Sequence, residues 1–486
     1  MDVQNSILTA AEIALAEKAV VMALEAGACK SRITLTKSVL DLAGTLNGEL
    51  DKVTHCLDRS LSIVLFVDGR YGSFSTNRLE ESDLRQFIRE AVETVRTLTE
   101  DPFRNLPAKE RIARDAVRGD ETGTYEPESY DALTPESLVK RALEAAVYDK
   151  AALPEGFRMI SEEGEWSVTI SDSLILDSQG TRCRCLDTLY EYGVEVTLLS
   201  ESGGGEKISG YWWDSSPWLA RLDAAMCGPT AVKKALAAAG GESIPSGQYR
   251  MVVSTECASK LVNPLMTALG GFALQQKNSF LLDSLGKALF PKRLTILDQP
   301  RVPGVNGARF YDSEGVATEN VPVIDHGVVS RYFLNTYMAA KMGLSPTVED
   351  VMRTVVVPTL PGTTLAHWAA SVAEGCHAQS DAGRSEATPS GVSRQQQPSA
   401  AEAVRPTIIV EGFNGGNHNP ATGDFSYGIE GQAILPDGRT VPVKEMLITG
   451  NFITLWQHLA DVLDDARPCA PKSIPSLIFD AVDFSG

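Results

Sequence analysis

The run with the most potential for chemistry is glycine-rich and lies near the end of the chain. Glycine lets backbone approach a ligand closely, while amide, hydroxyl and carboxylate side chains supply hydrogen bonds. One interpretation is a wall of a peptide-binding cleft. The other is an ordinary turn and strand, in which Asp424 and Ser426 only tie down the local backbone. The candidate residues are Asn414, Gly415, Gly416, Asn417, Thr422, Gly423, Asp424, Phe425 and Ser426.

Nucleophilic catalysis by this run is not predicted. His418, Asp424 and Ser426 are the residue types of a hydrolytic triad, but a triad is defined by geometry in space. The chain also lacks the G-x-S-x-G turn that exposes a nucleophilic serine in many hydrolases. We therefore predict no catalytic residue in this chain.

Metal binding is not predicted either. Zinc sites gather several Cys, His or carboxylate ligands, often at C-x-x-C or helical H-x-x-x-H spacing. The eight cysteines form no C-x-x-C pair, so reduced thiols are expected. The six histidines are too scattered for two of them to face one metal from a single helix: His55, His326, His367, His377, His418 and His458.

Aromatic residues could also bind a ligand. Trp212 and Trp213, which follow Gly210-Tyr211, could stack on a ligand. An aromatic cluster at the end of a β-rich unit more often packs in the core, and that interpretation is favoured here.

Composition and charge restrict the class of protein. The 486 residues exceed the size of a single core, so two or three domains are expected. A net charge of −19 disfavours nucleic acid and anionic lipid as partners. No apolar run is long enough to span a bilayer, and the N-terminus lacks the basic residues of a signal peptide. We expect no membrane association and a cytoplasmic location.

Residues 1–100 predict an α+β unit. Thr9 and Glu12 have the spacing of a capping box before a helix that ends near Gly27. Three or four strands follow within residues 32–76, with hairpin turns at Asn47-Gly48 and Asp68-Gly69. A helix over residues 84–98 should cover one face of this antiparallel sheet.

Residues 101–243 predict a second α+β unit. Residues 101–133 are polar and resemble a linker, and Thr134-Pro135 begins a helix. Apolar and polar residues then alternate from Trp166 to Ser200, which predicts a second antiparallel sheet.

Residues 244–486 predict a β-rich C-terminal domain. The boundary follows from Ile244-Pro245-Ser246-Gly247 before a strand. Residues 376–404 contain no aromatic residue, Leu or Ile, so a disordered insertion is expected there. The fold class is therefore α+β, with N-terminal antiparallel sheets covered by helices and a β-rich C-terminal domain.

Several motifs resemble the TldD/PmbA family of peptidase-like proteins, in particular its PmbA (TldE) branch. They occur in the family's order and cover almost the whole chain apart from the extreme N-terminus and the insertion. The motifs are residues 66–73 (FVDGRYGS), 244–247 (IPSG), 412–417 (GFNGGN), 422–426 (TGDFS), 442–445 (PVKE), 450–451 (GN) and 474–477 (IPSL).

The resemblance implies a role for this chain in a two-subunit enzyme. In the family, a TldD subunit holds zinc through an H-E-x-x-x-H helix, and a TldE subunit lacks these ligands. The corresponding helix here is residues 261–269, and neither His nor Glu occurs from Cys257 to Gly304. The resemblance therefore implies no cofactor in this chain and zinc in the partner subunit.

The implied partners are a TldD-like zinc subunit and unfolded or unstructured peptides, with proteolysis expected only from the pair. This chain would complete the chamber and hold substrate backbone along strand edges. The alternative is a stand-alone homodimeric peptide-binding protein without catalytic activity. A hydrolase that needs no zinc ranks last, because no nucleophile and base can be identified.

Overall fold

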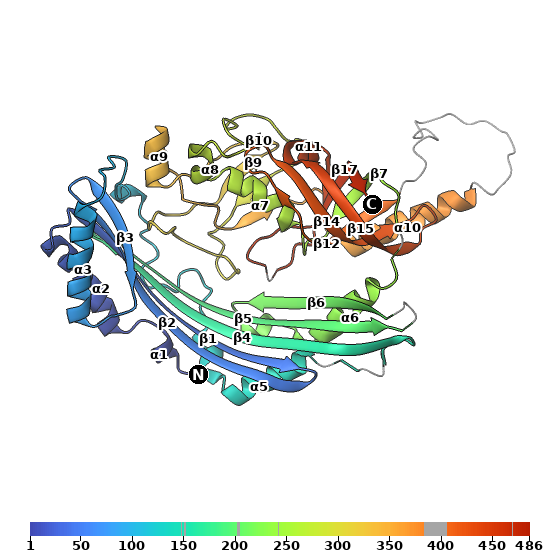
Figure 1. Cartoon of the computed structure of the whole chain (residues 1–486), viewed down its shortest axis with the longest axis horizontal. Helices are drawn as coiled ribbons and strands as arrows, with labels where there is room; N and C mark the ends of the chain where they lie inside the picture. The colour runs from blue at the N-terminus through green and yellow to red at the C-terminus, as the bar shows by residue number, and fades with distance from the viewer. Residues whose placement is uncertain (147, 150–151, 202–204, 242, 383–405, 469) are drawn as a thin grey trace.

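The computed structural model describes the chain except residues 147, 150–151, 202–204, 242, 383–405 and 469. Its N-terminal half is built on one long, curved, antiparallel sheet with the strand order β3-β2-β1-β4-β5-β6 (Figure 1). These strands are β1 (Lys30–Leu46), β2 (Glu49–Val67), β3 (Arg70–Thr76), β4 (Phe157–Asp177), β5 (Arg182–Ser200) and β6 (Glu206–Ser216).

The prediction of a second, separate sheet is wrong. Strands β1 and β4 pair in unbroken register from Arg32 opposite Asp177 to Leu46 opposite Glu163, which joins the two predicted sheets into one. The alternation in each segment predicts the strands and which residues share a face. It does not predict which strand pairs with β1 on the side away from β2. That choice depends on contacts between residues more than 100 positions apart.

Local signals in the first 100 residues are confirmed. Helix α2 (Ala10–Glu25) begins with a complete capping box between Thr9 and Glu12. Asn47 and Asp68 adopt positive φ before Gly48 and Gly69, as tight hairpin turns require.

The helices of the described N-terminal half cover one face of the sheet. Helices α2 and α3 (Glu81–Arg96) pack on one end of this face, and α5 (Pro135–Ala146) and α6 (Cys227–Ala237) pack on the other. The apolar residues beneath them include Ile33, Leu35, Ile63, Trp166 and Val168, all of which are buried. The short helices α1 (Val3–Ser6) and α4 (Pro127–Ala132) complete this half.

The segment expected to be a linker, residues 101–133, lies against both halves of the molecule. The backbone N–H of Ala113 donates to the carbonyl of Gly315, and the N–H of Arg184 donates to the carbonyl of Ala116. This segment therefore helps to fix the position of the C-terminal domain relative to the sheet.

The C-terminal domain is β-rich, and the α+β fold class is confirmed. Its larger sheet has the order β12-β7-β17-β15-β14-β13, with β16 beside β17, and it closes because β12 also pairs with β14. The strands are β7 (Gly247–Val253), β12 (Thr407–Phe413), β13 (Asn417–His418), β14 (Asp424–Ile434), β15 (Thr440–Asn451), β16 (Leu459–Val462) and β17 (Leu477–Ser485).

A smaller sheet and five helices surround this closed sheet. The smaller sheet contains β8 (Ile296–Asp298), β9 (Val321–Asp325), β10 (Val328–Val329) and β11 (Thr354–Val356). The helices are α7 (Ser259–Ala268), α8 (Gly271–Gln275), α9 (Thr336–Met342), α10 (Leu365–Ala382) and α11 (Phe452–Gln457).

The start of the predicted disordered insertion is helical. Helix α10 continues through residues 376–382, and Cys376 is buried. Upstream on this helix, Leu365, Trp368 and Val372 pack against a buried cluster of the C-terminal sheet, so the helix is already formed where the insertion begins. The rest of the insertion, residues 383–404, lies outside the described residues.

Candidate functional site

The face of the N-terminal sheet opposite the helices is lined with hydroxyl groups. Apolar residues such as Trp166, Val168 and Ile170 point toward the helices, so the residues between them point the other way. This second face is directed toward the C-terminal domain (Figure 1). Its half-buried or buried hydroxyl residues include Thr34, Thr36, Ser38, Ser167, Thr169, Ser171 and Ser173.

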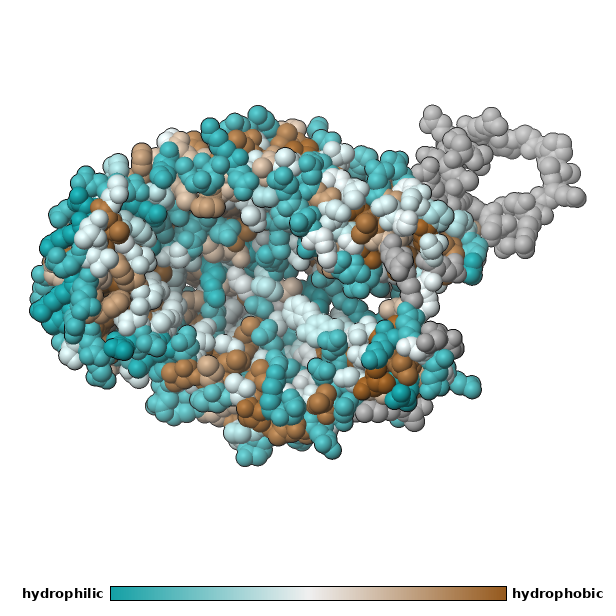
Figure 2. Space-filling model, viewed as in Figure 1, coloured by the Kyte–Doolittle hydropathy of each residue, from teal (hydrophilic) through white to brown (hydrophobic). Residues whose placement is uncertain are grey.

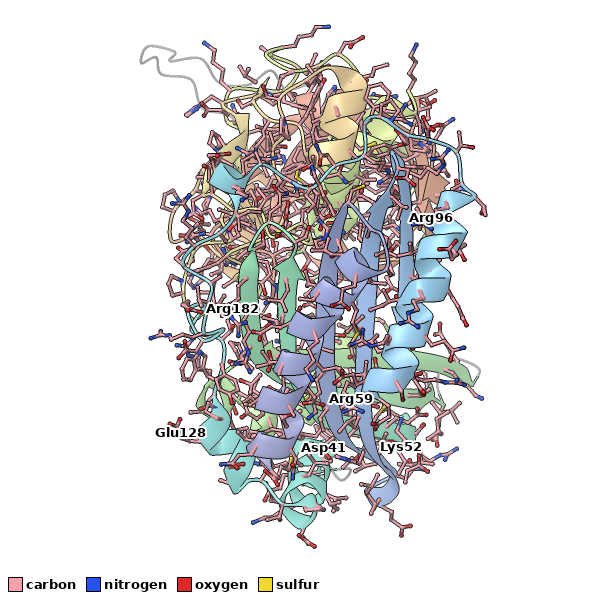
Figure 3. The ribbon with its side chains drawn as sticks, turned by 90° about the vertical axis from the view of Figure 1, so that its left-hand side faces the viewer. Asp41, Lys52, Arg59, Arg96, Glu128 and Arg182 are labelled. Atoms are coloured by element: carbon pink, nitrogen blue, oxygen red, sulfur yellow. The ribbon has the colours of Figure 1, made fainter. Side chains whose placement is uncertain are left out.

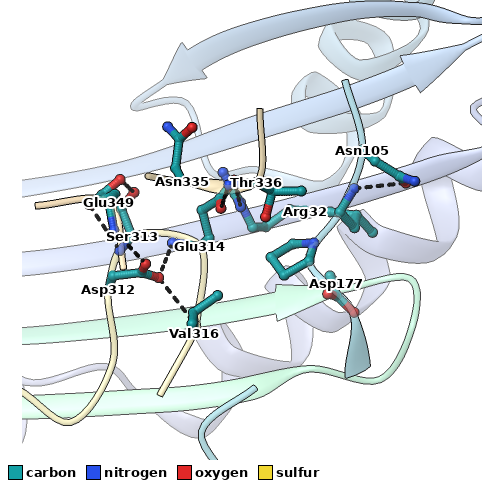
Figure 4. Close-up of polar contacts among 12 residues, drawn as sticks. Arg32, Asn105, Asp177, Asp312, Ser313, Glu314, Val316, Asn335, Thr336 and Glu349 are labelled. Atoms are coloured by element: carbon teal, nitrogen blue, oxygen red, sulfur yellow. Dashed lines mark hydrogen bonds and ion pairs between the residues drawn. The ribbon is translucent and has the colours of Figure 1, made fainter. Parts of the chain in front are cut away.

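Contacts with the C-terminal domain close the space over this face at one end. Arg32 of β1 lies 3.7 Å from a carboxylate oxygen of Glu314, and Glu314 also accepts a hydrogen bond from the N–H of Thr336 (Figure 4). Beside them, Phe310 and Tyr311 pack against Cys183 and Cys185 of β5.

A second contact joins the domains near β6. The guanidinium of Arg467 lies 4.2 Å from the ring centroid of Trp212 and 4.5 Å from that of Trp213, and it donates to the carbonyl of Trp213. Between the two halves of the molecule the surface is hollowed (Figure 2). The hydroxyl-lined face of the sheet and the C-terminal domain enclose this hollow.

Asp312 gives the first contact region a pH dependence. One carboxylate oxygen accepts from the backbone N–H groups of Glu314 and Val316, and the other accepts from the backbone N–H of Glu349 (Figure 4). Burial raises the pKa of Asp312 from 3.8 to about 7, although these backbone hydrogen bonds oppose the increase. Asp312 is 3% exposed.

The stability of the chain should therefore fall between pH 5 and 8. The folded-state pKa lies above the unfolded value, so the contribution of Asp312 is full below about pH 4 and is lost as the pH rises to about 7. An Asp312→Asn variant should lose less stability over this range, by on the order of 2 kcal/mol. Urea unfolding at pH 5 and pH 8 measures this difference, and equal decreases in the two proteins would contradict the assignment.

A cavity of about 530 Å³ opens on the sheet and is lined by residues of β1, β2, β4, β5 and β6. Glu165 and Glu191 line it beside the aromatic rings of Tyr211 and Trp213. Burial, and then the nearby charge of Glu165, raise the pKa of Glu191. Gly193 leaves room for Tyr211, because a Cβ there would lie 2.7 Å from the phenol oxygen.

This pocket was not predicted from the sequence, although the residues that indicate it are spaced in a regular pattern. Glutamates at Glu163, Glu165, Glu191 and Glu195 recur at every second or fourth position of two predicted strands, which places them on one face of the sheet. The interpretation of the aromatic triplet as core applies to Trp212, which packs against the helix-side cluster. In contrast, Tyr211 is 50% exposed and lines the pocket.

The glycine-rich candidate run lies in the C-terminal domain, at the end of its closed sheet. Asn417 pairs with Ser426, and His418 pairs with Phe425. The structure brings the run together as one hairpin, in which Asn414, Gly415, Gly416, Asn417, Thr422, Asp424 and Ser426 are exposed. Gly423 is buried, and Phe425 is 6% exposed and belongs to the core, 4.9 Å from the ring of Phe452.

Asp424 is held by its neighbours. It accepts hydrogen bonds from the hydroxyl of Thr422 (2.7 Å) and the side-chain amide of Asn451 (2.9 Å), and these two bonds lower its pKa. His418 is on the other face of the hairpin with Phe425, where its Nδ1 lies 3.1 Å from the hydroxyl of Tyr427. Strand alternation therefore separates His418 from Asp424 and Ser426, so these three residues do not form a triad.

Helix α7 lies beside this hairpin, and two of its polar side chains have partners within the chain. Lys260 places its ammonium 4.8 Å from the ring centroid of Tyr427, and the side-chain oxygen of Asn263 accepts from Lys472. The other large side chains of α7 are apolar and buried. Among the described residues, no group of three or more His, Cys, Asp or Glu side chains could hold a metal ion.

Family models of the PmbA/TldA metallopeptidases match three consecutive parts of the chain. Domain 1 matches residues 43–95, the central domain matches 125–239 and the C-terminal domain matches 246–486. A crystal structure from Bacteroides thetaiotaomicron, named as a proposed modulator of DNA gyrase, is 34% identical. It covers 98% of this chain and 99% of its own, with a TM-score of 0.86.

The chain belongs to the PmbA/TldD family.

Two further proteins are similar to this chain. The metalloprotease PmbA of Escherichia coli O157:H7 is 25% identical over 97% of this chain and 96% of its own length. TldE of Thermococcus kodakarensis shares the fold at 17% identity, with a TM-score of 0.74 over 97% of this chain and all of its own. As for membranes, no helix in the described part of the PmbA/TldD chain is long and apolar enough to cross a bilayer.

Proposed function

We propose that this chain is the non-zinc-binding subunit of a TldD/TldE-type metallopeptidase that acts on unfolded or unstructured peptides. The observation that carries the proposal is the hydroxyl-lined face of the N-terminal sheet. A sheet face that packed in a core would be apolar. This one presents serine and threonine to a hollow, where hydroxyl groups can both donate to and accept from a peptide backbone.

The residues of α7 support the assignment of zinc to a partner. By the family resemblance, α7 corresponds to the zinc-binding helix of the active branch. In this chain α7 instead carries Lys260, Asn263, whose side-chain oxygen already accepts from Lys472, and apolar residues. A zinc site needs several anionic or neutral N, O or S ligands at about 2.0–2.3 Å. The chain therefore contributes chamber walls and substrate contacts, and the TldD-like partner contributes metal-assisted hydrolysis.

The glycine-rich hairpin, residues 414–426, is proposed as a part of the substrate cleft. Its exposed amide groups, on Asn414 and Asn417, can bond an extended peptide. Phe425 supports the hairpin from the core, and Asp424 orders it through Thr422 and Asn451.

Zinc content and casein hydrolysis, measured for the purified chain alone and mixed with a TldD-like protein from the same organism, test the proposal. We expect the chain alone to be metal-free and inactive, and the mixture to cleave in a chelator-sensitive way. Hydrolysis by the chain alone would overturn it. Peptide binding without hydrolysis in any mixture would favour the stand-alone binding protein instead.

A further inference from the structure

The cavity on the hollow side of the N-terminal sheet has an excess of negative charge. Its volume of about 530 Å³ lies within the range of roughly 300–1,000 Å³ that is typical of ligand sites. The one cation among its lining residues is Lys52, near the hairpin end of β2 (Figure 3), and it already pairs with Glu165 at 3.2 Å. The acidic residues that line the cavity are Asp51, Glu163, Glu165, Glu191 and Glu195. The cavity therefore favours a positively charged group.

Ser167 presents an unsatisfied hydroxyl group to this cavity. It lies between Trp166 and Val168, which point toward the helices, so its own side chain points toward the hollow. Ser167 is only 7% exposed, and no hydrogen bond within the described part of the chain reaches its hydroxyl group. A buried hydroxyl group without a partner is unfavourable, and a ligand with an N–H donor would satisfy it.

Glu191 lies beside Ser167, and its carboxylate is also unpaired. Ser167 of β4 is opposite Glu191 of β5 in the register of the sheet. Glu191 is half-buried, and the described residues give its carboxylate neither a hydrogen bond nor an ion pair. Burial and the charge of Glu165 both disfavour its ionised form. A cation bound next to Glu191 would offset both effects.

Aromatic rings form a further wall of the cavity. Tyr211 and Trp213 line it on β6, and the guanidinium of Arg467 already lies 4.5 Å from the ring centroid of Trp213. Guanidinium groups stack on aromatic faces and pair with carboxylates through their planar array of N–H groups. The walls thus combine the two kinds of group that recognise an organic cation.

We propose that this cavity binds the basic side chain of an arginine or lysine in an extended peptide. Glu191 pairs with the cation, Ser167 accepts one of its N–H groups, and Tyr211 covers its apolar stem. The hydroxyl groups elsewhere on the same face hold the peptide backbone. The inference rests on the proposed function, because it names the class of peptide that the chamber favours.

Fluorescence anisotropy of labelled, unstructured peptides, measured with the purified chain alone, tests the proposal. The peptides differ at one central position, which is Arg, Lys or citrulline. Citrulline has the shape of arginine without its charge. The Arg and Lys peptides should bind about 10-fold more tightly than the citrulline peptide. Glu191→Gln should remove most of this preference.

Ser167→Ala tests the hydroxyl group separately. It should weaken binding of the Arg peptide by about 3-fold, because the cation loses an acceptor. The urea unfolding midpoint should not fall, since the hydroxyl group has no partner to lose within the described chain. Unchanged affinity in this variant would show that Ser167 does not contact the ligand and would overturn its place in the proposal.

Glu128→Gln is the matched control for Glu191→Gln. It removes one exposed carboxylate from α4, well apart from Lys52 in Figure 3, and should leave the affinity unchanged. Equal losses in the two variants would overturn the proposal, and so would equal affinities for the Arg and citrulline peptides. Spermidine should compete weakly. If spermidine binds more tightly than the Arg peptide, the cavity takes free polyamines and the assignment to a peptide is wrong.

The result separates this proposal from the peptidase role. Casein hydrolysis by the chain mixed with a TldD-like protein is measured without the labelled peptides. Hydrolysis without any preference for the Arg peptide would overturn only the assignment of the cavity. Binding of the Arg peptide through Glu191, in a chain whose mixtures never hydrolyse casein, would support the cavity and overturn the peptidase role.

Discussion

Removing the carboxylate of Asp172 should lower the free energy of unfolding by about 3–5 kcal/mol. Asp172 is 1% exposed and accepts from Arg184 through Nε at 3.0 Å and Nη2 at 2.6 Å. It also accepts from the backbone N–H of Leu8 at 2.9 Å. An Asp172→Ala variant leaves the half-buried guanidinium without its partner and removes the acceptor of the Leu8 N–H.

The effect is large because a buried charge without a partner has a high free-energy cost. The side chain of Arg184 is 16% exposed, so water replaces the lost carboxylate poorly. Arg184→Ala should cost a similar amount, because it leaves the carboxylate with only the Leu8 N–H. The double alanine variant should be less destabilised than the sum of the two, because no unpaired charge remains.

Urea unfolding of the three variants, followed by the fluorescence of buried tryptophans, measures these energies. Arg250→Ala is the matched control, because its 2.7 Å pair with Asp480 is about half exposed and should be worth at most about 1 kcal/mol. A loss for Asp172→Ala no greater than that control would show that the buried pair does not stabilise the fold.

Replacing Gly416 with alanine should disrupt the glycine-rich hairpin, whereas the same change at Gly415 should only strain it. Both residues have positive φ, 84° and 82°, which costs a residue with a Cβ about 1–2 kcal/mol. A Cβ at Gly416 would lie 2.0 Å from the carbonyl oxygen of Ser426, but one at Gly415 would meet no atom within 4 Å. Gly416→Ala must therefore also push β13 away from β14.

Hydrogen exchange across residues 414–426, together with urea unfolding, distinguishes the two variants. Gly416→Ala should speed exchange in the hairpin and reduce stability by more than Gly415→Ala does. If the hairpin is part of the substrate cleft, Gly416→Ala should also reduce the activity of the mixed enzyme more strongly than Gly415→Ala. Identical exchange in the two variants would show that β13 tolerates the displacement.

Features that depend on neighbours in sequence could be predicted well. The capping box of α2 and the hairpin turns at Asn47-Gly48 and Asp68-Gly69 involve residues at most a few positions apart, and the structure contains all three. The motifs of residues 66–73 and 422–426 likewise identified the family without reference to their positions in space.

The candidate site was predicted less completely. The run 414–426 does form one exposed hairpin, but the burial of Phe425 and the separation of His418 from Asp424 follow from how β13 pairs with β14. The acidic pocket near Tyr211 was not predicted, because it combines residues of β1, β2, β4, β5 and β6. Helix α10 also extends into the segment that was predicted to be disordered, because the upstream residues of this helix pack on the C-terminal sheet.

The sequence by itself determined the local elements, their two-sided character and the family. Alternation such as Trp166, Ser167, Val168 and Thr169 requires a strand with one apolar and one hydroxyl face, because successive side chains point in opposite directions. Only the tertiary structure decided that β1 pairs with β4, that helices take the apolar face and that the hydroxyl face borders a hollow. These outcomes depend on contacts between segments that are distant in the sequence. The free energies of such contacts cannot be read from a local sequence pattern.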